Sequence, residues 1–261
     1  MIKILGKVID GSTIANEFPK DSIEVKIINI LSSSSEIYKY SSLNELKFEI
    51  NMRINIINTA KTLYKSDFKF KTFEDSFCNN EYWERTENGG FLQKESVKTS
   101  DAINDIFKNS SKYGTECATA MVIIYYKAIL EIYPDELFNE TFQKIFLISW
   151  HYLDDDLDIL VYKNKADYLP GDYRYFSNPD FNPETPEWRG ENVIDLGDGT
   201  YYGHGIGIKS AEDMIKTLNK HRKKDSVTSA FLMDITGYPN FKYLAALYYN
   251  YLEKMRYEWN L

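Results

Sequence analysis

The sequence predicts a single domain that mixes helices and strands, in the α/β (α+β) class. The residues from Ala118 to Tyr133 are apolar nearly all the way round and include no Gly or Pro, which is typical of a buried helix. Gly197-Asp198-Gly199 lies between two strand-like runs and indicates a β-hairpin. Because no internal repeat or clear linker interrupts the 261 residues, we expect one domain over 1–261, with an N-terminal arm (1–35) and a C-terminal helical tail (230–261).

The composition excludes several classes of protein. Hydrophobic residues make up 43% and charged residues 27%, which is ordinary for a soluble globular chain. A net charge of −8 argues against nucleic acid or an anionic membrane as the main partner. No apolar run approaches the roughly 20 residues that span a bilayer, and the N-terminus lacks a signal-peptide core. Two cysteines make no disulfide framework, so we expect a protein made in a reducing cytoplasm.

The first hundred residues predict short elements and one long helix. Hydrophobic patterns indicate a strand or arm over Ile2–Ile9, a strand or helix over Ile23–Leu31 and a helix from Ser42 to about Leu63. Ser42-Leu43-Asn44-Glu45 resembles a capping box at the start of that long helix. Further along, we expect a hairpin turn at Asn88-Gly89-Gly90 and a short helix over Ser100–Asn109.

The second half predicts a short helix (Asp135–Phe142), a buried strand (Ile145–Tyr152), a long irregular segment ending at Trp188, and outer amphipathic helices (Ser210–Lys223 and Phe241–Tyr257). Four of the five residues from Asp154 to Asp158 are acidic, but they lack the spacing and turn glycine of a calcium loop. A solvated loop is the better interpretation, and no metal or cofactor is expected.

Cys117 lies where a loop turns into the buried helix. Gly114 and Thr115 are acceptable cap residues, and they would place Cys117 in the first helical turn. There the free N–H groups and the helix dipole favour a thiolate and can stabilise an oxyanion. The plain alternative is a small core residue, because cysteine is often buried for packing alone.

The predicted hairpin supplies a carboxylate and an imidazole. A two-residue turn, whether Gly197-Asp198 or Asp198-Gly199, places Glu191 and His204 on the same face, whereas a three-residue turn places them on opposite faces. Gly203, Gly205 and Gly207 lie on the other face from His204 and let a ligand or backbone approach closely. Cys117, Glu191 and His204 are together the kinds of side chain that covalent cysteine catalysis requires.

Five runs of residues carry a resemblance to a known family. They are Tyr113–Tyr126 with its Glu-Cys-Ala-Thr-Ala core, Ser149–Tyr152, Asn178–Phe181, Trp188–Asn192 and His204–Gly207. The chain resembles the spore-coat transglutaminases (protein-glutamine γ-glutamyltransferases) of endospore-forming bacteria over most of residues 40–225. This resemblance implies a compact fold with an NlpC/P60-like, papain-related core, in which the nucleophile helix packs on an antiparallel sheet.

The resemblance also implies roles for individual residues. Cys117 matches the nucleophile, Glu191 the principal acid/base partner, Glu116 an assisting carboxylate and His204 a supporting histidine. We expect Trp150, Trp188, Phe70 and Asn192 to bind substrate and shelter a thioester from water. The implied reaction joins glutamine and lysine side chains of proteins without calcium, by a monomer made in the mother-cell cytoplasm and incorporated into the spore coat.

Two alternatives remain at the level of the sequence. A cysteine peptidase or amidase would use the same nucleophile with water as acceptor, and would rely on His204 as its base. A structural coat protein with a vestigial site would fit the 21 tyrosines. Ammonia release together with incorporation of an amine would distinguish a transglutaminase from the peptidase or amidase. Thiol alkylation kinetics would test the structural protein, because a vestigial cysteine should react like free cysteine or not at all.

Overall fold

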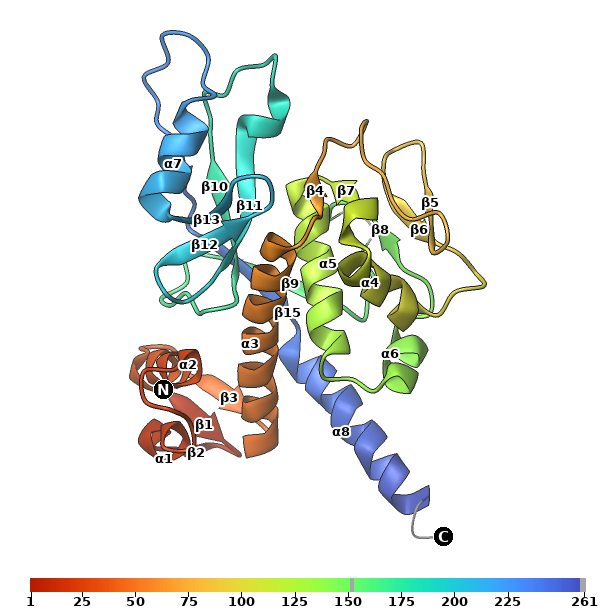
Figure 1. The fold of residues 1–261 in the computed structure, drawn as a ribbon. Coiled ribbons are helices and arrows are strands. Elements are labelled where there is room, and N and C mark those ends of the chain that lie inside the picture. The colour runs from red at the N-terminus through yellow and green to blue at the C-terminus, as the bar shows by residue number, and fades with distance from the viewer. Residues whose placement is uncertain (151–152, 259–261) are drawn as a thin grey trace.

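The computed structural model describes residues 1–150 and 153–258, and Figure 1 shows how its helices and strands are arranged. Its helices are α1 (Gly11–Ala15), α2 (Ile23–Ser33), α3 (Leu43–Lys65), α4 (Thr99–Lys108), α5 (Cys117–Leu130), α6 (Asp135–Thr141), α7 (Ala211–Asn219) and α8 (Phe241–Glu258). Its strands are β1 (Ile2–Ile4), β2 (Lys7–Val8), β3 (Tyr38–Tyr40), β4 (Lys69–Phe70), β5 (Trp83–Arg85), β6 (Phe91–Gln93), β7 (Gly114–Thr115), β8 (Phe146–Leu147), β9 (Ile159–Lys163), β10 (Tyr173–Ser177), β11 (Gly190–Asp195), β12 (Thr200–Gly203), β13 (Gly207–Ser210), β14 (Phe231–Leu232) and β15 (Ile235–Pro239).

Helix α3 runs through the middle of the molecule, with β10–β13 on one side and α4, α5 and α6 on the other (Figure 1). Its first turn is capped as the sequence predicts, since Ser42 Oγ accepts the N–H of Glu45 at 3.1 Å. The returning bond of the capping box is displaced by one residue, because Glu45 accepts from the N–H of Ser41 at 2.7 Å. The predicted long helix is therefore confirmed, with one altered cap contact.

The N-terminal residues form a small lobe at the start of α3 (Figure 1). The predicted arm is a strand pair, β1 and β2, and β3 pairs with β1 in parallel. The segment left open between strand and helix is helix α2, which Ser22 caps. Its apolar face buries Ile27, Ile28 and Leu31 against Leu46 and Ile50 of α3. Burial of that face fixes the lobe to the rest of the fold.

Helix α5 is buried on every side, as its apolar sequence predicts. Its residues form one core with α3, α4 and the sheet residues Tyr173, Ile194, Leu196 and Tyr202. The helix that begins with Cys117 therefore packs on an antiparallel sheet. This packing holds the first turn of α5 against strand β11.

The large sheet has seven strands in the order β13-β12-β11-β10-β15-β9, with β14 paired to β10. The irregular segment predicted before Trp188 is wrong in part, because it contains β9 and the central strand β10. Strand β10 lies between Pro170 and Pro179, and these prolines flank the strand without interrupting its hydrogen bonds. Four prolines in this stretch (Pro170, Pro179, Pro183 and Pro186) had favoured an irregular segment throughout.

The β11–β12 hairpin has a three-residue turn, and this outcome corrects the two-residue alternatives. Asp195 pairs with Tyr201, and the N–H of Leu196 donates to the carbonyl of Thr200 at 3.0 Å, which leaves residues 197–199 as the turn. Gly197 and Gly199 have φ of 78° and 89°, a conformation that glycine adopts without strain. Glu191 and His204 consequently do not lie side by side on one face.

Other predicted elements hold with shifted ends. The turn at residues 88–90 connects β5 to β6, α4 and α6 occupy the two short helical patterns, and α7 and α8 occupy the two amphipathic ones. The strand expected over Ile145–Tyr152 is only β8, after which Ser149 has a φ of 50°; His151 and Tyr152 lie outside the described residues. The acidic residues 154–158 precede β9, and Asp158 accepts from Asn240 at the start of α8.

The described residues, 1–150 and 153–258, hold neither a metal-binding cluster nor a membrane-spanning helix. They contain no group of three or more His, Cys, Asp or Glu side chains arranged to hold a metal ion. None of the helices in this part of the chain is long and apolar enough to cross a membrane.

Candidate functional site

Cys117 opens into a cavity of about 520 Å³ between the first turn of α5 and strands β10 and β11. Aromatic side chains form much of its wall: Phe70, Phe73, Trp150, Tyr173 and Tyr175. Polar residues also line it, namely Glu116, Asn192, Glu187 and Arg189. A nucleophile in a mostly apolar cavity with a few polar groups is the arrangement expected of an enzyme site.

Glu116 caps the helix that carries the nucleophile. Its carboxylate accepts the N–H of Thr119 at 2.8 Å, and also the N–H of Ala118 and the hydroxyl of Thr119. The expectation that Gly114 or Thr115 caps the helix is wrong, because these residues form β7 and pair with β4. Cys117 is therefore the first helical residue, and the N–H groups of Ala118 and Thr119 are already bonded to a carboxylate.

The amide of Asn192 holds the thiol. Its Nδ2 donates to Cys117 Sγ at 3.0 Å, and its backbone N–H also stabilises the thiolate form. Its Oδ1 accepts from Tyr173 Oη at 2.8 Å and from Trp150 Nε1 at 3.3 Å. Because an indole N–H only donates, Trp150 fixes which end of the amide is oxygen. Two donors therefore orient Asn192 so that its N–H group faces the sulfur.

The surroundings of Cys117 favour the neutral thiol over the thiolate. Burial, followed by the charges of Glu191 and Glu116, raises the pKa of Cys117 above its ordinary value, and the hydrogen bonds of Asn192 only partly oppose this. This direction is opposite to the one expected from the helix dipole, which favours a thiolate. Desolvation exceeds the dipole here, since a cap carboxylate already occupies the positive end of α5.

Glu191 is a buried carboxyl group whose charge acts on this thiol. Burial and the nearby charge of Glu116 raise the pKa of Glu191 well above its ordinary value. Among the described residues, its Oε1 has no hydrogen-bond partner. A buried, unsatisfied carboxylate oxygen costs stability, and such a group is well matched to accept a proton at neutral pH.

His204 lies at the end of β12, where both of its ring nitrogens are engaged. Nε2 is 3.1 Å from the carbonyl of Lys69 and Nδ1 is 3.1 Å from the hydroxyl of Tyr202. Since a carbonyl only accepts, Nε2 carries the proton and Nδ1 accepts from Tyr202. Burial against the Phe68 and Phe70 rings lowers the pKa of His204 to about 4, so the imidazole is neutral.

The cavity includes three of the four residues expected to bind substrate. Phe70, Trp150 and Asn192 line it, whereas Trp188 does not. The indole of Trp188 stacks on His221, with ring centroids 3.5 Å apart. The sequence analysis missed Tyr173 and Tyr175, because it did not predict β10. Arg189 belongs to the run Trp188–Asn192. The effect of its charge on the pKa of Glu116, which it lowers, was not expected from the sequence.

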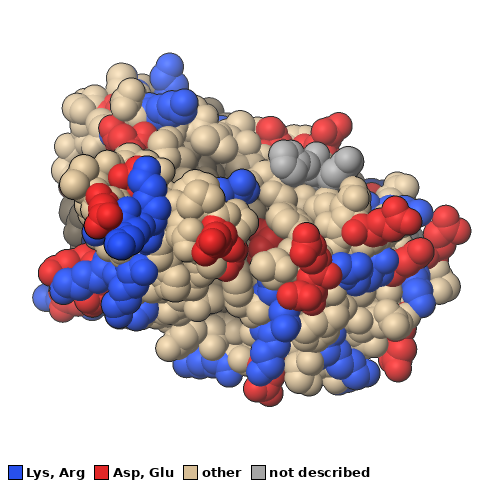
Figure 2. Space-filling model, turned by 90° about the horizontal axis from the view of Figure 1, so that it is seen from above, with Lys and Arg blue, Asp and Glu red and all other residues tan. Residues whose placement is uncertain are grey.

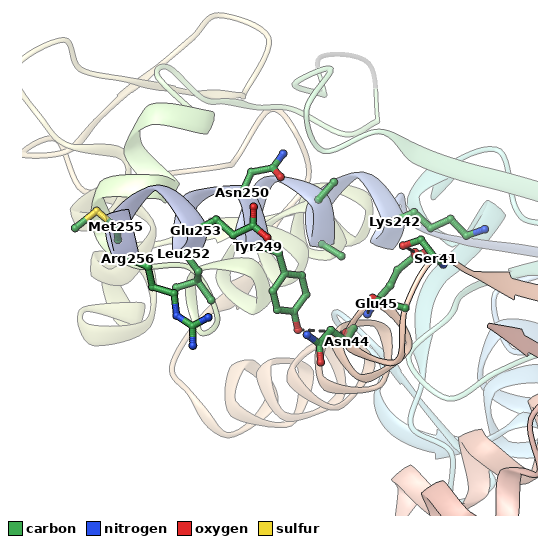
Figure 3. Close-up of a pocket in the computed structure, with 13 residues that line it drawn as sticks. Ser41, Asn44, Glu45, Lys242, Tyr249, Asn250, Leu252, Glu253, Met255 and Arg256 are labelled. Atoms are coloured by element: carbon green, nitrogen blue, oxygen red, sulfur yellow. Dashed lines mark hydrogen bonds between the residues drawn. The ribbon is translucent and has the colours of Figure 1, made fainter. Parts of the chain in front are cut away.

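A larger hollow of about 840 Å³ lies elsewhere, between the start of α3 and helix α8 (Figure 3). Tyr249 crosses it and donates to the carbonyl of Asn44 at 3.2 Å. Polar side chains such as Lys242, Glu253 and Arg256 line it, but its lining has no cysteine. We therefore assign the chemistry to the smaller cavity at Cys117.

The second cysteine and the surface offer no competing site. Cys78 is partly buried, and this burial raises the pKa of its thiol to about 11. Acidic and basic side chains lie next to one another over the face shown in Figure 2. Such mixed charge is typical of an ordinary solvated surface.

The chain is similar to known proteins over most of its length. The profile of the family "Protein-glutamine gamma-glutamyltransferase" matches residues 1–248. Proteins of that name from two Bacillus cereus strains are 47% and 46% identical over 232 residues, which cover 88% of this chain and 83% of theirs. A solved transglutaminase from Geobacillus stearothermophilus, without its C-terminal extension, has a TM-score of 0.76 and 45% identity, covering 79% of this chain and 98% of that one. The chain therefore belongs to the protein-glutamine γ-glutamyltransferases, the bacterial transglutaminases.

Proposed function

We propose that Cys117 and Glu191 carry out the transfer that this family performs, with Asn192 stabilising charge at the reacting centre. Cys117 Sγ attacks the γ-carboxamide of a protein glutamine, the carbon–nitrogen bond breaks, and ammonia leaves. The ε-amine of a protein lysine then attacks the thioester, which restores the thiol and leaves an isopeptide bond. The observation that carries the proposal is the buried carboxyl of Glu191, whose Oε1 has no partner among the described residues and whose charge acts on the Cys117 thiol.

The paired pKa values support Glu191 as the proton acceptor. Forming a thiolate alone in a dry site is costly, because no solvent stabilises the charge. Moving the thiol proton to Glu191 keeps one negative charge on the pair, so the cost is smaller. The same carboxyl can then protonate the leaving ammonia and later take a proton from the lysine, whose ordinary pKa of about 10.4 keeps it charged in water.

The oxyanion of each tetrahedral intermediate needs donors that are not already used. Glu116 occupies the N–H groups of Ala118 and Thr119. Asn192 offers both its side-chain amide and its backbone N–H at the sulfur. We therefore assign the main oxyanion donors to Asn192, whereas the sequence analysis assigned them to the helix terminus.

The aromatic wall supports transfer in preference to hydrolysis. Water competes with lysine for the thioester, and Phe70, Trp150 and Tyr173 enclose Cys117 with apolar surface. Glu116 supports the site through its cap and its charge, and His204 supports it through packing. We assign Trp188 no direct contact with substrate.

The finer classification and the biological setting are also proposals. The nucleophile helix on an antiparallel sheet supports an NlpC/P60-like, papain-related core in a single domain over 1–261. The resemblance described above supports spore-coat proteins as substrates, calcium-independent action, a monomeric enzyme, and synthesis in the mother cell before incorporation into the coat. Purified coat fractions probed for the chain and for its isopeptide products would test that setting.

The central test is incorporation of a fluorescent primary amine into a glutamine-containing protein, with ammonia measured in the same reaction. We expect Cys117→Ala to abolish incorporation and Cys78→Ala, the matched control, to retain it. EDTA should leave the rate unchanged. Ammonia release without incorporation would indicate a hydrolase, and loss of activity in Cys78→Ala alone would overturn the assignment of the nucleophile.

A further inference from the structure

The chain carries only two glutamines, Gln93 and Gln143, among 261 residues that include 25 lysines. An enzyme that joins glutamine to lysine meets both of these groups on its own surface. Lysine is abundant there, so the number of accessible glutamines decides how far the enzyme can become its own substrate. Both glutamines lie within the described residues, and the structure distinguishes them sharply.

Gln93 is closed to any second molecule. Only 3% of the residue is exposed, and every polar atom of its amide is used inside the protein. Its Nε2 donates to the carbonyl of Val97 at 2.8 Å, and its Oε1 accepts from the N–H of Ile145 at 3.0 Å and from Thr99 at 3.2 Å. Reaching its carboxamide would require unfolding of β6 and the loop before β8.

Gln143 is the opposite case. It is exposed, and it lies on the bend between the end of α6 and the start of β8. Lys144 follows it, with nearly half of its side chain exposed and its amine 3.4 Å from a Glu95 oxygen. The buried side chains of Phe142 and Ile145 anchor the bend on both sides. The bend therefore projects two residues into solvent, and the Gln143 side chain makes no hydrogen bond to the described part of the chain.

Gln143 cannot reach the thiol of its own chain. The neighbouring Phe142 packs on Tyr126, with ring centroids 5.2 Å apart. Tyr126 lies nine residues after Cys117 on α5, which places it roughly 14 Å along the helix at 1.5 Å per residue. Since Phe142 and Ile145 are buried, the bend cannot swing across that distance without breaking the core.

We propose that Gln143 is the one glutamine through which this chain serves as an acyl donor, and that it does so toward a second copy. The proposal rests on the proposed roles of Cys117 and Glu191. Cys117 Sγ of one copy bonds to Cδ of Gln143 in the other, the Cδ–Nε2 bond breaks, and ammonia leaves with the thiol proton. A primary amine then forms the isopeptide bond, the carbon–sulfur bond breaks, and the amine's proton restores the thiol. Each chain can thereby be joined to an amine-bearing neighbour at one defined point.

The test uses an inactive copy as the substrate. Cys117→Ala protein in excess is mixed with a trace of the unaltered enzyme, a dansyl-labelled primary amine and casein. We expect one dansyl amine per inactive chain, mapped by mass spectrometry to Gln143, with a rate that rises with the concentration of the inactive chain. Casein labelling in the same tube reports that the enzyme is active, so failure of the proposed function is recognised separately.

Two double variants complete the design. Cys117→Ala with Gln143→Asn should lose the label, because asparagine is one methylene shorter and keeps the amide. Cys117→Ala with Lys144→Arg is the matched control, and it should retain the label since the charge beside Glu95 is preserved. An unlabelled inactive chain beside labelled casein, or a label that persists after Gln143→Asn, would overturn the proposal.

Discussion

Glu191 lies across Gly203 on the neighbouring strand: a Cβ atom at position 203 would stand 2.6 Å from Glu191 Oε1 and 2.7 Å from its Cγ. Strand β12 therefore needs a residue without a side chain where the carboxyl group of β11 folds over it. The absence of a side chain at 203 is what allows Glu191 to be buried in this position.

Gly203→Ala should consequently impair catalysis by displacing Glu191. We expect amine incorporation to fall by about 10²-fold or more, the scale of losing a positioned acid–base group. The substitution should leave binding of a glutamine protein less affected than the maximum rate. A variant that folds by circular dichroism and keeps full activity would show that the position of Glu191 does not matter.

The second prediction concerns Asn192, which joins Cys117 Sγ to Trp150 and Tyr173 through one amide. Asn192→Ala removes the donor and should lower the maximum rate by about 10²–10³, the range for loss of one oxyanion donor. Tyr173→Phe leaves the Asn192 amide in place but removes the hydroxyl that donates to its Oδ1, so we expect a smaller loss of rate. Equal rates for Asn192→Ala and the unaltered enzyme would exclude this role.

The third prediction ranks the three possible proton carriers. Glu191→Gln should cost about 10²–10⁴ in rate, the range for general acid–base catalysis. Glu116→Gln should cost less, because the amide oxygen can still accept from the first turn of α5. His204→Ala should also cost less than Glu191→Gln, since both ring nitrogens are already engaged, by Tyr202 and by the Lys69 carbonyl.

Alkylation of the Cys117 thiol tests independently whether Glu191 or His204 accepts its proton. In the unaltered enzyme, proton transfer to Glu191 should let Cys117 react with iodoacetamide near neutral pH. In Glu191→Gln, burial and the charge of Glu116 still raise the pKa of Cys117 while the charge of Glu191 no longer does, so a slower reaction near neutral pH would report loss of the proton acceptor and not a higher thiol pKa. His204→Ala should keep the profile of the unaltered enzyme. The reverse pattern would indicate a papain-like site with histidine as the base.

The sequence predicted the parts of the fold that depend on local pattern. Helix α5 is apolar on all sides, and α3 has a capping residue followed by helical spacing, so both were predicted. Strand β10 was not, because its five residues lie inside a proline-rich stretch and gain their structure from pairing with β11. Pairing between distant segments leaves little local signal.

The site was predictable in its residues and not in its electrostatics. The runs around Cys117 and Glu191 carried the resemblance to the family. The turn of the hairpin was not determined, because Gly197-Asp198-Gly199 suits turns of two or three residues alike. The resting state of Cys117 depends on Glu116 folding back as the cap, and on burial beneath aromatic side chains. Neither effect can be predicted from spacing along the chain.

The last prediction concerns Asp195, at the end of β11, whose pKa is raised from 3.8 to about 6, chiefly by burial. Asp172 raises it further, whereas the N–H of Gly197 and the charges of Arg174 and Lys26 oppose the shift. A carboxyl group with a higher pKa in the folded state favours folding below pH 4, and this contribution is lost as the pH rises through about 6.

Asp195→Asn cannot ionise and keeps an oxygen to accept from Gly197, which donates to Oδ1 at 2.8 Å. Relative to the unaltered chain, it should therefore gain about 2–3 kcal/mol of unfolding free energy at pH 7, since each pKa unit corresponds to about 1.4 kcal/mol. At pH 4 the gain should vanish, because the aspartate is then protonated in the folded chain. Urea unfolding of both proteins at the two pH values measures this difference. A gain of the same size at pH 4 and pH 7 would show that the stabilisation does not come from titration of Asp195.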